Sequence, residues 1–475
     1  MCDIVGRDEE IEIMRDLEQS RVSEFLVVYG RRRIGKTFLI RELFQDKFVF
    51  SMTGIDNVNM TQQLMNFNLT LRQHDASVEW EPVNCWLLAF QQLRAFLEKS
   101  KKKRKIVFID ELPWFDTLHS DFIQGLEHFW NSWASGRKDI FLIVSGSATS
   151  WMINKLINNR GGLHNRVTQR ICLEPFTLAE CSEFMNRKNV HLDQYQLIQL
   201  YMVMGGVPYY WDKVTKGKSA SQIIERECFS RNGSLKEEFN NIFKSLFRQH
   251  QRHVSIVKAL ATKSKGLSRD EISKLSGISN GGGLTRLLDE LEACHFITRY
   301  IPFGRVSRDS LYQLNDMFSL FHLRFMQTST KKDAGNWLKT IDSPKHRAWS
   351  GYAFEQVCMQ HSAQIKKALG ISGIETHISS WRSRSDDSGA QADMIIDRRD
   401  QIINLCEMKF SVNPYIINKK YAAELSMKAG RFRYDTKTKK AVHIVMLTTF
   451  GVANMELYGG IVQHNLTMDC LFEKA

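Results

Sequence analysis

The chain has 475 residues, 43% hydrophobic and 25% charged, and 65 basic against 52 acidic residues give it a net charge of +13. This length predicts about three domains. No stretch reaches the roughly 18 apolar residues of a membrane span, and the start of the chain lacks the pattern of a secretion signal. The nine cysteines include no CxxC pair, which argues against a disulfide scaffold or structural zinc and favours a reducing cytoplasm. The basic excess suits DNA or another polyanion, although a generally basic surface explains it equally well.

The first motif joins a strand to a helix. An apolar run at 25–29 precedes a loop of the form GxxxxGK[ST], and a helical pattern follows at 38–44. The loop residues are Gly30, Arg31, Arg32, Arg33, Ile34, Gly35, Lys36 and Thr37. In such a loop, backbone N–H groups and the helix N-terminus surround the β-phosphate of a nucleotide. We expect Lys36 to reach the β- and γ-phosphates and Thr37 to hold Mg²⁺.

Two later strands end in polar side chains that complete this site. The apolar strand at 105–109 closes on Asp110 and Glu111. Asp110 is expected to bind the Mg²⁺ water shell and Glu111 to polarise the attacking water. A third strand at 140–144 ends at Ser145, whose hydroxyl would contact the γ-phosphate or that water. Capping of the next helix by Ser145 or Ser147 is an equally good interpretation.

The middle of the chain changes character twice. Residues 176–245 are mostly helical and predict a lid. Residues 246–317 predict three helices followed by two strands around a basic turn at 304–308, which is the pattern of a winged helix-turn-helix. The third helix, at 283–294, would enter the major groove of DNA and the wing would touch phosphates. Docking of a protein is the alternative use of such a module. Residues 318–345 are expected to form a connecting helix and a linker.

The last segment, 346–475, brings acidic and basic residues together on a predicted hairpin. Asp393 opens its first strand, and Glu407 and Lys409 point to the same face of the second strand. Apolar neighbours suggest that this sheet is buried, where charges are costly unless they are used. Asp393 and Glu407 could hold a metal for phosphodiester cleavage while Lys409 positions water. Glu355, expected near the start of a helix at 350–358, could add a further carboxylate.

Taken together, these motifs resemble prokaryotic archaeal-type ATPases of the AAA+/STAND grouping that carry a C-terminal domain similar to the PD-(D/E)xK nuclease superfamily. The resemblance implies ATP and Mg²⁺ as ligands, with Mn²⁺ as an alternative at the nuclease site. It places a polar sensor at Ser145 and an arginine acting on the γ-phosphate at Arg166 or Arg170, across a contact in a homo-oligomer. It maps the nuclease acids to Asp393 and Glu407 and the lysine to Lys409. Ala392 stands where the nuclease motif has proline.

The sequence therefore predicts an α/β protein with five segments: a P-loop NTPase parallel sheet at 1–175, a helical lid at 176–245, a winged helix at 246–317, a connection at 318–345 and a restriction-endonuclease-like α/β domain at 346–475. Two functions remain open. One is an ATP-gated, metal-dependent nuclease acting on DNA. The other is a signalling or scaffold ATPase whose C-terminal domain does not cleave.

Overall fold

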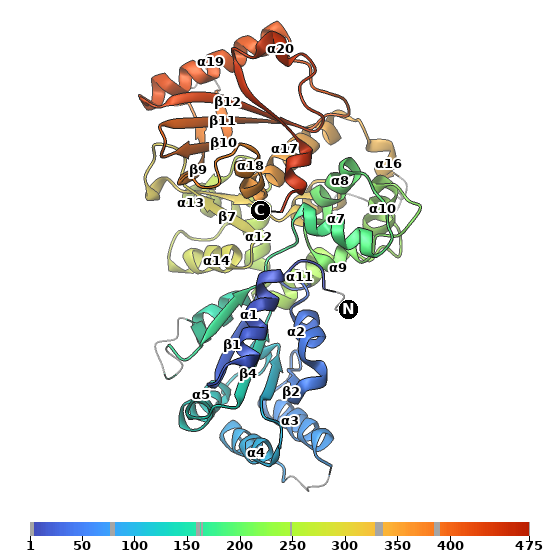
Figure 1. The fold of residues 1–475 in the computed structure, drawn as a ribbon, viewed down its shortest axis with the longest axis vertical. Coiled ribbons are helices and arrows are strands. Elements are labelled where there is room, and N and C mark those ends of the chain that lie inside the picture. Colours follow the sequence, from blue (N-terminus) through green and yellow to red (C-terminus); the bar gives the residue numbers. More distant parts are fainter. Residues whose placement is uncertain are drawn as a thin grey trace. The chain divides into compact units, whose positions relative to one another are not determined.

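The computed structural model describes residues 4–76, 81–157, 162, 165–247, 249–327, 336–383 and 390–474 (Figure 1). The chain forms two compact units, Met1–Pro175 and Phe176–Ala475. None of the described helices is both long and apolar enough to cross a membrane. No disulfide joins the eight cysteines in the described ranges.

The first unit is built on five parallel strands in the order β2-β3-β4-β1-β5. The strands are β1 (Glu24–Tyr29), β2 (Phe48–Thr53), β3 (Lys105–Asp110), β4 (Ile140–Gly146) and β5 (Gln169–Cys172). The helices are α1 (Asp8–Gln19), α2 (Lys36–Phe44), α3 (Met60–His74), α4 (Trp86–Lys99), α5 (Phe122–Ser132) and α6 (Thr149–Met152). This confirms the predicted α/β P-loop fold with a parallel sheet.

Helices cover both faces of that sheet, and the alternation of side chains along β1 shows why. Phe25 and Val27 belong to a core shared with α3, α4 and α5, whereas Leu26 and Val28 belong to a core shared with α1 and α2. Strands buried on both faces read as continuous apolar runs, as the sequence does here. The carboxyl ends of the strands consequently meet at one edge, where the polar motif residues follow.

The second unit begins with a helical region. Its helices are α7 (Leu178–Arg187), α8 (Gln194–Met204), α9 (Pro208–Trp211), α10 (Ala220–Ile224) and α11 (Glu238–Leu246). Thr177 starts α7 with a capping box in which Glu180 is the reciprocal partner. The turn before α9 lies against this start, because the Phe176 N–H donates to the Gly206 carbonyl at 2.7 Å. A Cβ at Gly206 would lie 1.8 Å from the Phe176 carbonyl oxygen, so only glycine fits.

A small module of three helices and three short strands follows, and we call residues 250–314 the three-stranded module. It contains α12 (His250–Leu260), β6 (Leu267–Ser268), α13 (Arg269–Ser276), α14 (Gly282–Ala293), β7 (Ile297–Tyr300) and β8 (Leu311–Leu314). The strands pair antiparallel in the order β6-β8-β7. Four leucines on one side of α14 are buried, as the helical spacing predicts.

The C-terminal part has a mixed five-stranded sheet in the order β13-β12-β11-β10-β9. The strands are β9 (Thr376–Arg382), β10 (Gln391–Arg398), β11 (Ile402–Lys409), β12 (Ala441–Thr448) and β13 (Val462–Thr467). The helices from the module onward are α15 (Met317–Phe321), α16 (Asn336–Thr340), α17 (Pro344–Gln360), α18 (Ser362–Ala368), α19 (Lys419–Thr436) and α20 (Met455–Tyr458). β10 is antiparallel to β9 and β11, whereas β11, β12 and β13 are parallel. α19 packs on one face of this sheet, and α17 packs against β11.

Two expectations about the chain between the three-stranded module and the C-terminal sheet are wrong. Residues 336–345, predicted as a linker, contain α16 and the start of α17. Helix α17 begins at Pro344, where Ser343 accepts a hydrogen bond from the His346 N–H at 3.2 Å. Proline at the first position and serine before it favour a helix start. Glu355 therefore lies in the C-terminal half of α17 and not near the start of a helix.

Candidate functional site

The glycine loop of the first unit connects the end of β1 to the start of α2. Gly30 has φ +137° and Gly35 has φ +92°, both unfavourable for side chains. A Cβ at Gly30 would also lie 2.5 Å from the Leu173 carbonyl oxygen. Ile34 anchors the loop in the core beside α1 and α2. The two motif glycines are thus fixed by backbone geometry, and the loop wraps the N-terminus of α2.

Lys36, the first residue of α2, folds back into this loop. Its Nζ donates to the carbonyl oxygens of Gly30 at 3.0 Å and Arg31 at 2.9 Å. The residue is only 5% exposed. A buried ammonium group beside the N-terminal end of a helix creates strong positive potential in a small volume. This arrangement fits an anion such as a phosphate.

Asp110, at the end of β3, is the centre of the polar edge of the sheet. Its Oδ2 accepts from Thr37 Oγ1 at 2.9 Å, and its Oδ1 accepts from the Glu111 N–H at 3.1 Å. The Ser145 hydroxyl also donates to Oδ1. The carboxylate is nearly enclosed, since Asp110 is 3% exposed. A hydroxyl and a carboxylate in contact supply the hard oxygen ligands that Mg²⁺ prefers, so the residues present fit the ion.

Glu111 is held by a different serine. It has φ +50°, and Ser147 Oγ donates to its two carboxylate oxygens at 2.8 and 3.0 Å. The Ser147 N–H donates to Oε2 at 3.1 Å. The residue before α6 is Ala148, which makes no side-chain cap. The capping alternative for Ser145 and Ser147 is therefore wrong, because both hydroxyls serve the carboxylates.

The predicted arginines lie outside this cluster of contacts. Arg166 is exposed in the turn before β5, and Arg170 is exposed within β5. Arg32 and Arg33 of the loop are partly buried, and Arg31 is buried. The role of Arg166 or Arg170 on a γ-phosphate stays a prediction.

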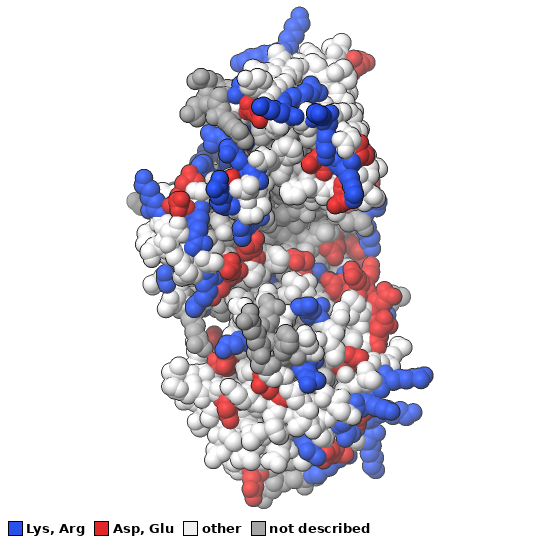
Figure 2. Space-filling model, turned by 90° about the vertical axis from the view of Figure 1, so that its left-hand side faces the viewer, with Lys and Arg blue, Asp and Glu red and all other residues white. Residues whose placement is uncertain are grey.

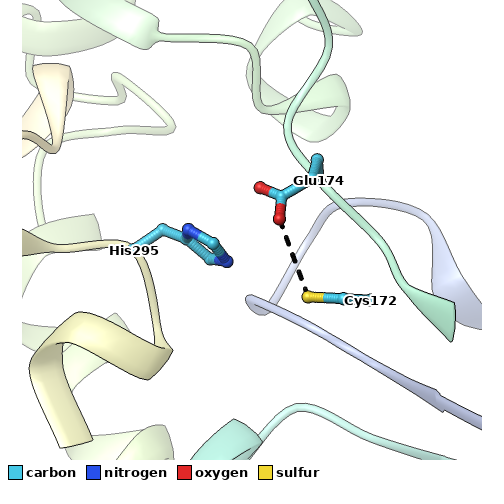
Figure 3. A group of neighbouring side chains, drawn as sticks. All are labelled: Cys172, Glu174 and His295. Carbon is cyan, nitrogen blue, oxygen red and sulfur yellow. Dashed lines mark hydrogen bonds between the residues drawn. The ribbon is translucent and has the colours of Figure 1, made fainter. Parts of the chain in front are cut away.

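The end of β5 carries a second small polar group. Cys172 donates to Glu174 Oε1 at 3.7 Å (Figure 3), and Arg7 Nη2 donates to the Glu174 carbonyl at 2.5 Å. Burial, with Cys172 as the second cause, raises the pKa of the neighbouring Tyr29 phenol. His295, drawn in the same figure, belongs to the other compact unit. The contact of Arg7 ties the turn at Gly6 and Arg7 to the end of β5. β5 pairs with β1, the strand that the glycine loop follows.

In the C-terminal sheet, Asp393 and Glu407 lie on paired strands. Met394 is opposite Cys406, so Asp393 and Glu407 occupy the next positions along β10 and β11. The pairing of β10 with β9 shifts register between Ala392 and Ile395. Such irregularities re-aim side chains and occur beside active sites. The structure therefore brings the two predicted acids to the same end of the hairpin.

Side chains from α19 hold Glu407. Lys428 Nζ donates to its Oε1, and the Tyr421 hydroxyl donates to its Oε2 at 3.4 Å. Lys409 Nζ lies 5.2 Å from the centre of the Tyr421 ring. Glu407 is 6% exposed, and a buried carboxylate is stable only when paired in this way.

Glu355 of α17 and Asp393 influence each other electrostatically. Burial and then the Asp393 charge raise the pKa of Glu355 to about 8, while Lys409 and Lys265 oppose the shift. Burial and then the Glu407 charge raise the pKa of Asp393. Carboxyl groups with raised pKa values in a cleft are typical of functional sites. Within the described ranges, however, the ligand atoms of Glu355, Asp393 and Glu407 do not all come within 4.8 Å of one another.

A cavity of about 230 Å³ opens beside these acids, inside the second unit. Asp393 and Glu355 line it together with Trp381 and Arg382 of β9. The segment 263–266 and Tyr300 of the three-stranded module line it as well. The candidate site therefore includes residues far apart in the sequence.

Sequence reasoning missed Lys265, Lys428 and Tyr421. None belongs to a motif, and each lies on an element whose packing against the hairpin cannot be seen from local spacing. A weak signal existed for α19, where Tyr421 and Lys428 are seven residues apart and therefore share one face of a helix.

Charges of both signs are mixed on the face of the molecule drawn in Figure 2. On the face shown in Figure 2, Lys and Arg side chains lie in several separate groups with acidic side chains between them. The net charge of +13 is thus not gathered into one basic stripe on that face. Helix α14 carries one arginine against three carboxylates, and Arg286 bonds Glu290 at 3.1 Å.

The parallel sheet, the glycine loop and the Thr37–Asp110 contact define a P-loop ATPase domain. Residues 4–214 match the family described as an ATPase domain predominantly from Archaea, so the chain contains an archaeal-type ATPase domain. "Uncharacterized protein MJECL04" of Methanocaldococcus jannaschii is 23% identical over 387 residues, covering 81% of this chain and 82% of that protein.

Among solved structures, two examples match this chain over about two thirds of its length. The Walker-type ATPase PABY2304 of Pyrococcus abyssi has a TM-score of 0.48 and 17% identity, covering 68% of this chain and 97% of that one. The ORC2 protein of Aeropyrum pernix, solved as ADPNP and ADP complexes, has a TM-score of 0.41 and 11% identity, covering 71% and 95%. At these scores and identities, neither structure transfers a function to this chain.

Proposed function

We propose that the first unit binds ATP with Mg²⁺ and hydrolyses it. The observation that carries this proposal is the contact of Thr37 with Asp110, next to a buried Lys36 inside the glycine loop. When bound, the ion would neutralise charge that develops on the transferred phosphoryl group. Lys36 would exchange its two loop carbonyls for phosphate oxygens. Glu111 is the residue that would orient and accept a proton from water.

Variants at the loop and at the base test this proposal together. Lys36→Ala should abolish ATP binding, measured by titration calorimetry, and hydrolysis, measured as released phosphate. Glu111→Gln should bind ATP but lose hydrolysis. Lys47→Ala, which removes an exposed lysine paired with Glu18 at 2.7 Å, is the matched control. Unchanged hydrolysis in both Lys36→Ala and Glu111→Gln would refute the assignment.

We further propose that the C-terminal sheet carries a metal-dependent phosphodiesterase site of the PD-(D/E)xK kind. Support comes from the paired positions of Asp393 and Glu407, the raised pKa of Asp393, and the cavity beside them. The carboxylate oxygens fit Mg²⁺ or Mn²⁺, which would activate water and stabilise charge on the phosphate. Lys409 would orient the water, and Glu355 would move closer once a cation relieves repulsion among the acids.

DNA is the substrate that we favour, with ATP regulating access to the site. The three-stranded module has the element order of a winged helix, but the acidic character of α14 argues against major-groove contact through that helix. We therefore place DNA at the cavity side of the module. A homo-oligomer with Arg166 reaching a neighbouring nucleotide site remains part of the proposal.

Cleavage assays separate this function from its alternative. Asp393→Ala and Lys409→Ala should abolish cleavage while ATP hydrolysis persists. If the wild-type protein hydrolyses ATP but cleaves neither DNA nor RNA with Mg²⁺ or Mn²⁺, the signalling or scaffold ATPase is the better account.

A further inference from the structure

Lys265 faces the acids of the candidate nuclease site from a different part of the chain. It lies between α12 and β6 in the three-stranded module, and its Nζ donates to Oε1 of Gln391 at the start of β10. Gln391 is two residues before Asp393. Both Lys265 and Gln391 line the cavity that Glu355 and Asp393 share.

The backbone that carries Lys265 is tightly fixed. The Tyr300 hydroxyl donates to the Lys265 carbonyl at 2.6 Å, and Gln313 Nε2 donates to the Ser264 carbonyl at 2.6 Å. Gly266 has φ +77°, and a Cβ there would lie 2.9 Å from the Tyr312 carbonyl oxygen. The turn is therefore held in one conformation, which directs the Lys265 side chain toward the cavity.

The module is also fastened to the C-terminal sheet within the second unit. The Phe303 N–H donates to the Ser380 carbonyl of β9 at 2.7 Å, and its ring packs on Phe432 of α19 with centroids 5.2 Å apart. The wall that carries Lys265 is thus part of the same body as the wall that carries Asp393.

Charge pairing distinguishes Lys265 from the other lysines at the site. Lys428 is bonded to Glu407, and Lys409 lies over the Tyr421 ring. Among the described residues, the Lys265 ammonium group hydrogen-bonds the neutral amide of Gln391, and the residue is exposed. A lysine bonded to a neutral amide gives up less than an ion-paired lysine does when it binds a phosphate oxygen.

We propose that Lys265 binds the phosphate backbone of a nucleic-acid strand lying in this cavity, so that the three-stranded module supplies one wall of the cleavage site. The proposal deepens the proposed nuclease function and relies on it for the position of the reacting phosphate. The proposal gives the three-stranded module a role on the side of its strands, away from the acidic α14.

Binding measurements test this without requiring cleavage. Fluorescein-labelled single-stranded and duplex DNA are titrated with the full chain, with Ca²⁺ replacing Mg²⁺, over a series of salt concentrations. Lys265→Gln should weaken binding about fivefold to tenfold and reduce the slope of log affinity against log salt by about 1, as loss of one phosphate contact does. Lys265→Arg keeps the positive charge, so its affinity and its salt slope should both stay within about twofold of the wild-type values.

Lys274→Gln is the matched control. Lys274 is an exposed lysine of α13 in the same module, and it is not among the residues that line the cavity. Equal effects of Lys274→Gln and Lys265→Gln, or none from Lys265→Gln, would overturn the proposal. If binding depends on Lys265 but the wild type cleaves nothing with Mg²⁺ or Mn²⁺, the binding role stands and the nuclease function fails.

Discussion

The buried carboxyl group of Glu355 predicts a distinctive dependence of stability on pH. Burial and the nearby Asp393 charge raise its pKa to about 8, from 4.5 for an unperturbed glutamate. Between these values the folded chain holds a proton that the unfolded chain has lost. The free energy of unfolding therefore contains a contribution that is fully present below the unfolded pKa and is lost as pH rises toward the folded pKa.

The size of this effect follows from the shift. Each pKa unit corresponds to about 1.4 kcal/mol, so the full shift would amount to about 4 to 5 kcal/mol. Because Glu355→Gln removes this ionisation, we expect it to stabilise the protein by about 4 kcal/mol at pH 8.5 and to change stability by less than about 1 kcal/mol at pH 5.

Calorimetric unfolding at several pH values measures this difference. For a unit of this size, about 4 kcal/mol corresponds to a rise in Tm of about 6 °C at pH 8.5. Glu375→Gln is the control, because the Glu375 side chain is 74% exposed in a surface pair with Arg399. Parallel pH profiles for Glu355→Gln and the wild type would refute the reasoning.

Four substitutions probe other parts of the structure. Ser145→Ala removes a donor to Asp110 and should weaken Mg²⁺–ATP binding about tenfold by calorimetry; unchanged affinity would contradict its role. Ser147→Ala removes donors to Glu111 and should change kcat while leaving ATP affinity within about twofold, whereas an effect on affinity alone would argue against separate roles for the two serines. Gly206→Ala should lower the free energy of unfolding, measured by denaturant titration, by more than about 2 kcal/mol, since its Cβ would clash with a carbonyl oxygen. Gly430→Ala, in an open position of α19, should raise the free energy of unfolding by about 0.5 to 1 kcal/mol in the same titration. A lower free energy of unfolding for Gly430→Ala would show that the position is not open.

The nucleotide site could be predicted because its parts are local motifs at strand ends. Glycines at 30 and 35 mark a backbone that a side chain would not tolerate, and Asp110 follows a strand apolar on both faces. Parallel strands bring such residues to one edge whatever their separation in the chain. That Ser145 bonds Asp110 whereas Ser147 bonds Glu111 could not be predicted, because each hydroxyl can reach several partners from that edge.

The C-terminal site could be predicted only in part. The hairpin that carries Asp393 and Glu407 is local, and its two apolar runs joined by a polar turn are visible in the sequence. The helix that contains Glu355 begins earlier than the sequence suggests. Ser343 and Pro344 favour a helix start, but they stand at the end of a segment that resembles a linker. Lys265 is separated from Asp393 by more than one hundred residues, and only tertiary packing of the module on the sheet brings them together.

The measurement that tests the account most directly follows cleavage of supercoiled plasmid, linear duplex and single-stranded DNA with Mg²⁺ or Mn²⁺, with and without ATP. Wild type and Glu407→Ala are compared, and phosphate release is measured in the same samples. The account predicts metal-dependent cleavage that Glu407→Ala loses, ATP hydrolysis that it keeps, and a difference in cleavage rate with ATP. ATP hydrolysis without any cleavage by the wild type, or equal cleavage by both proteins, would contradict it.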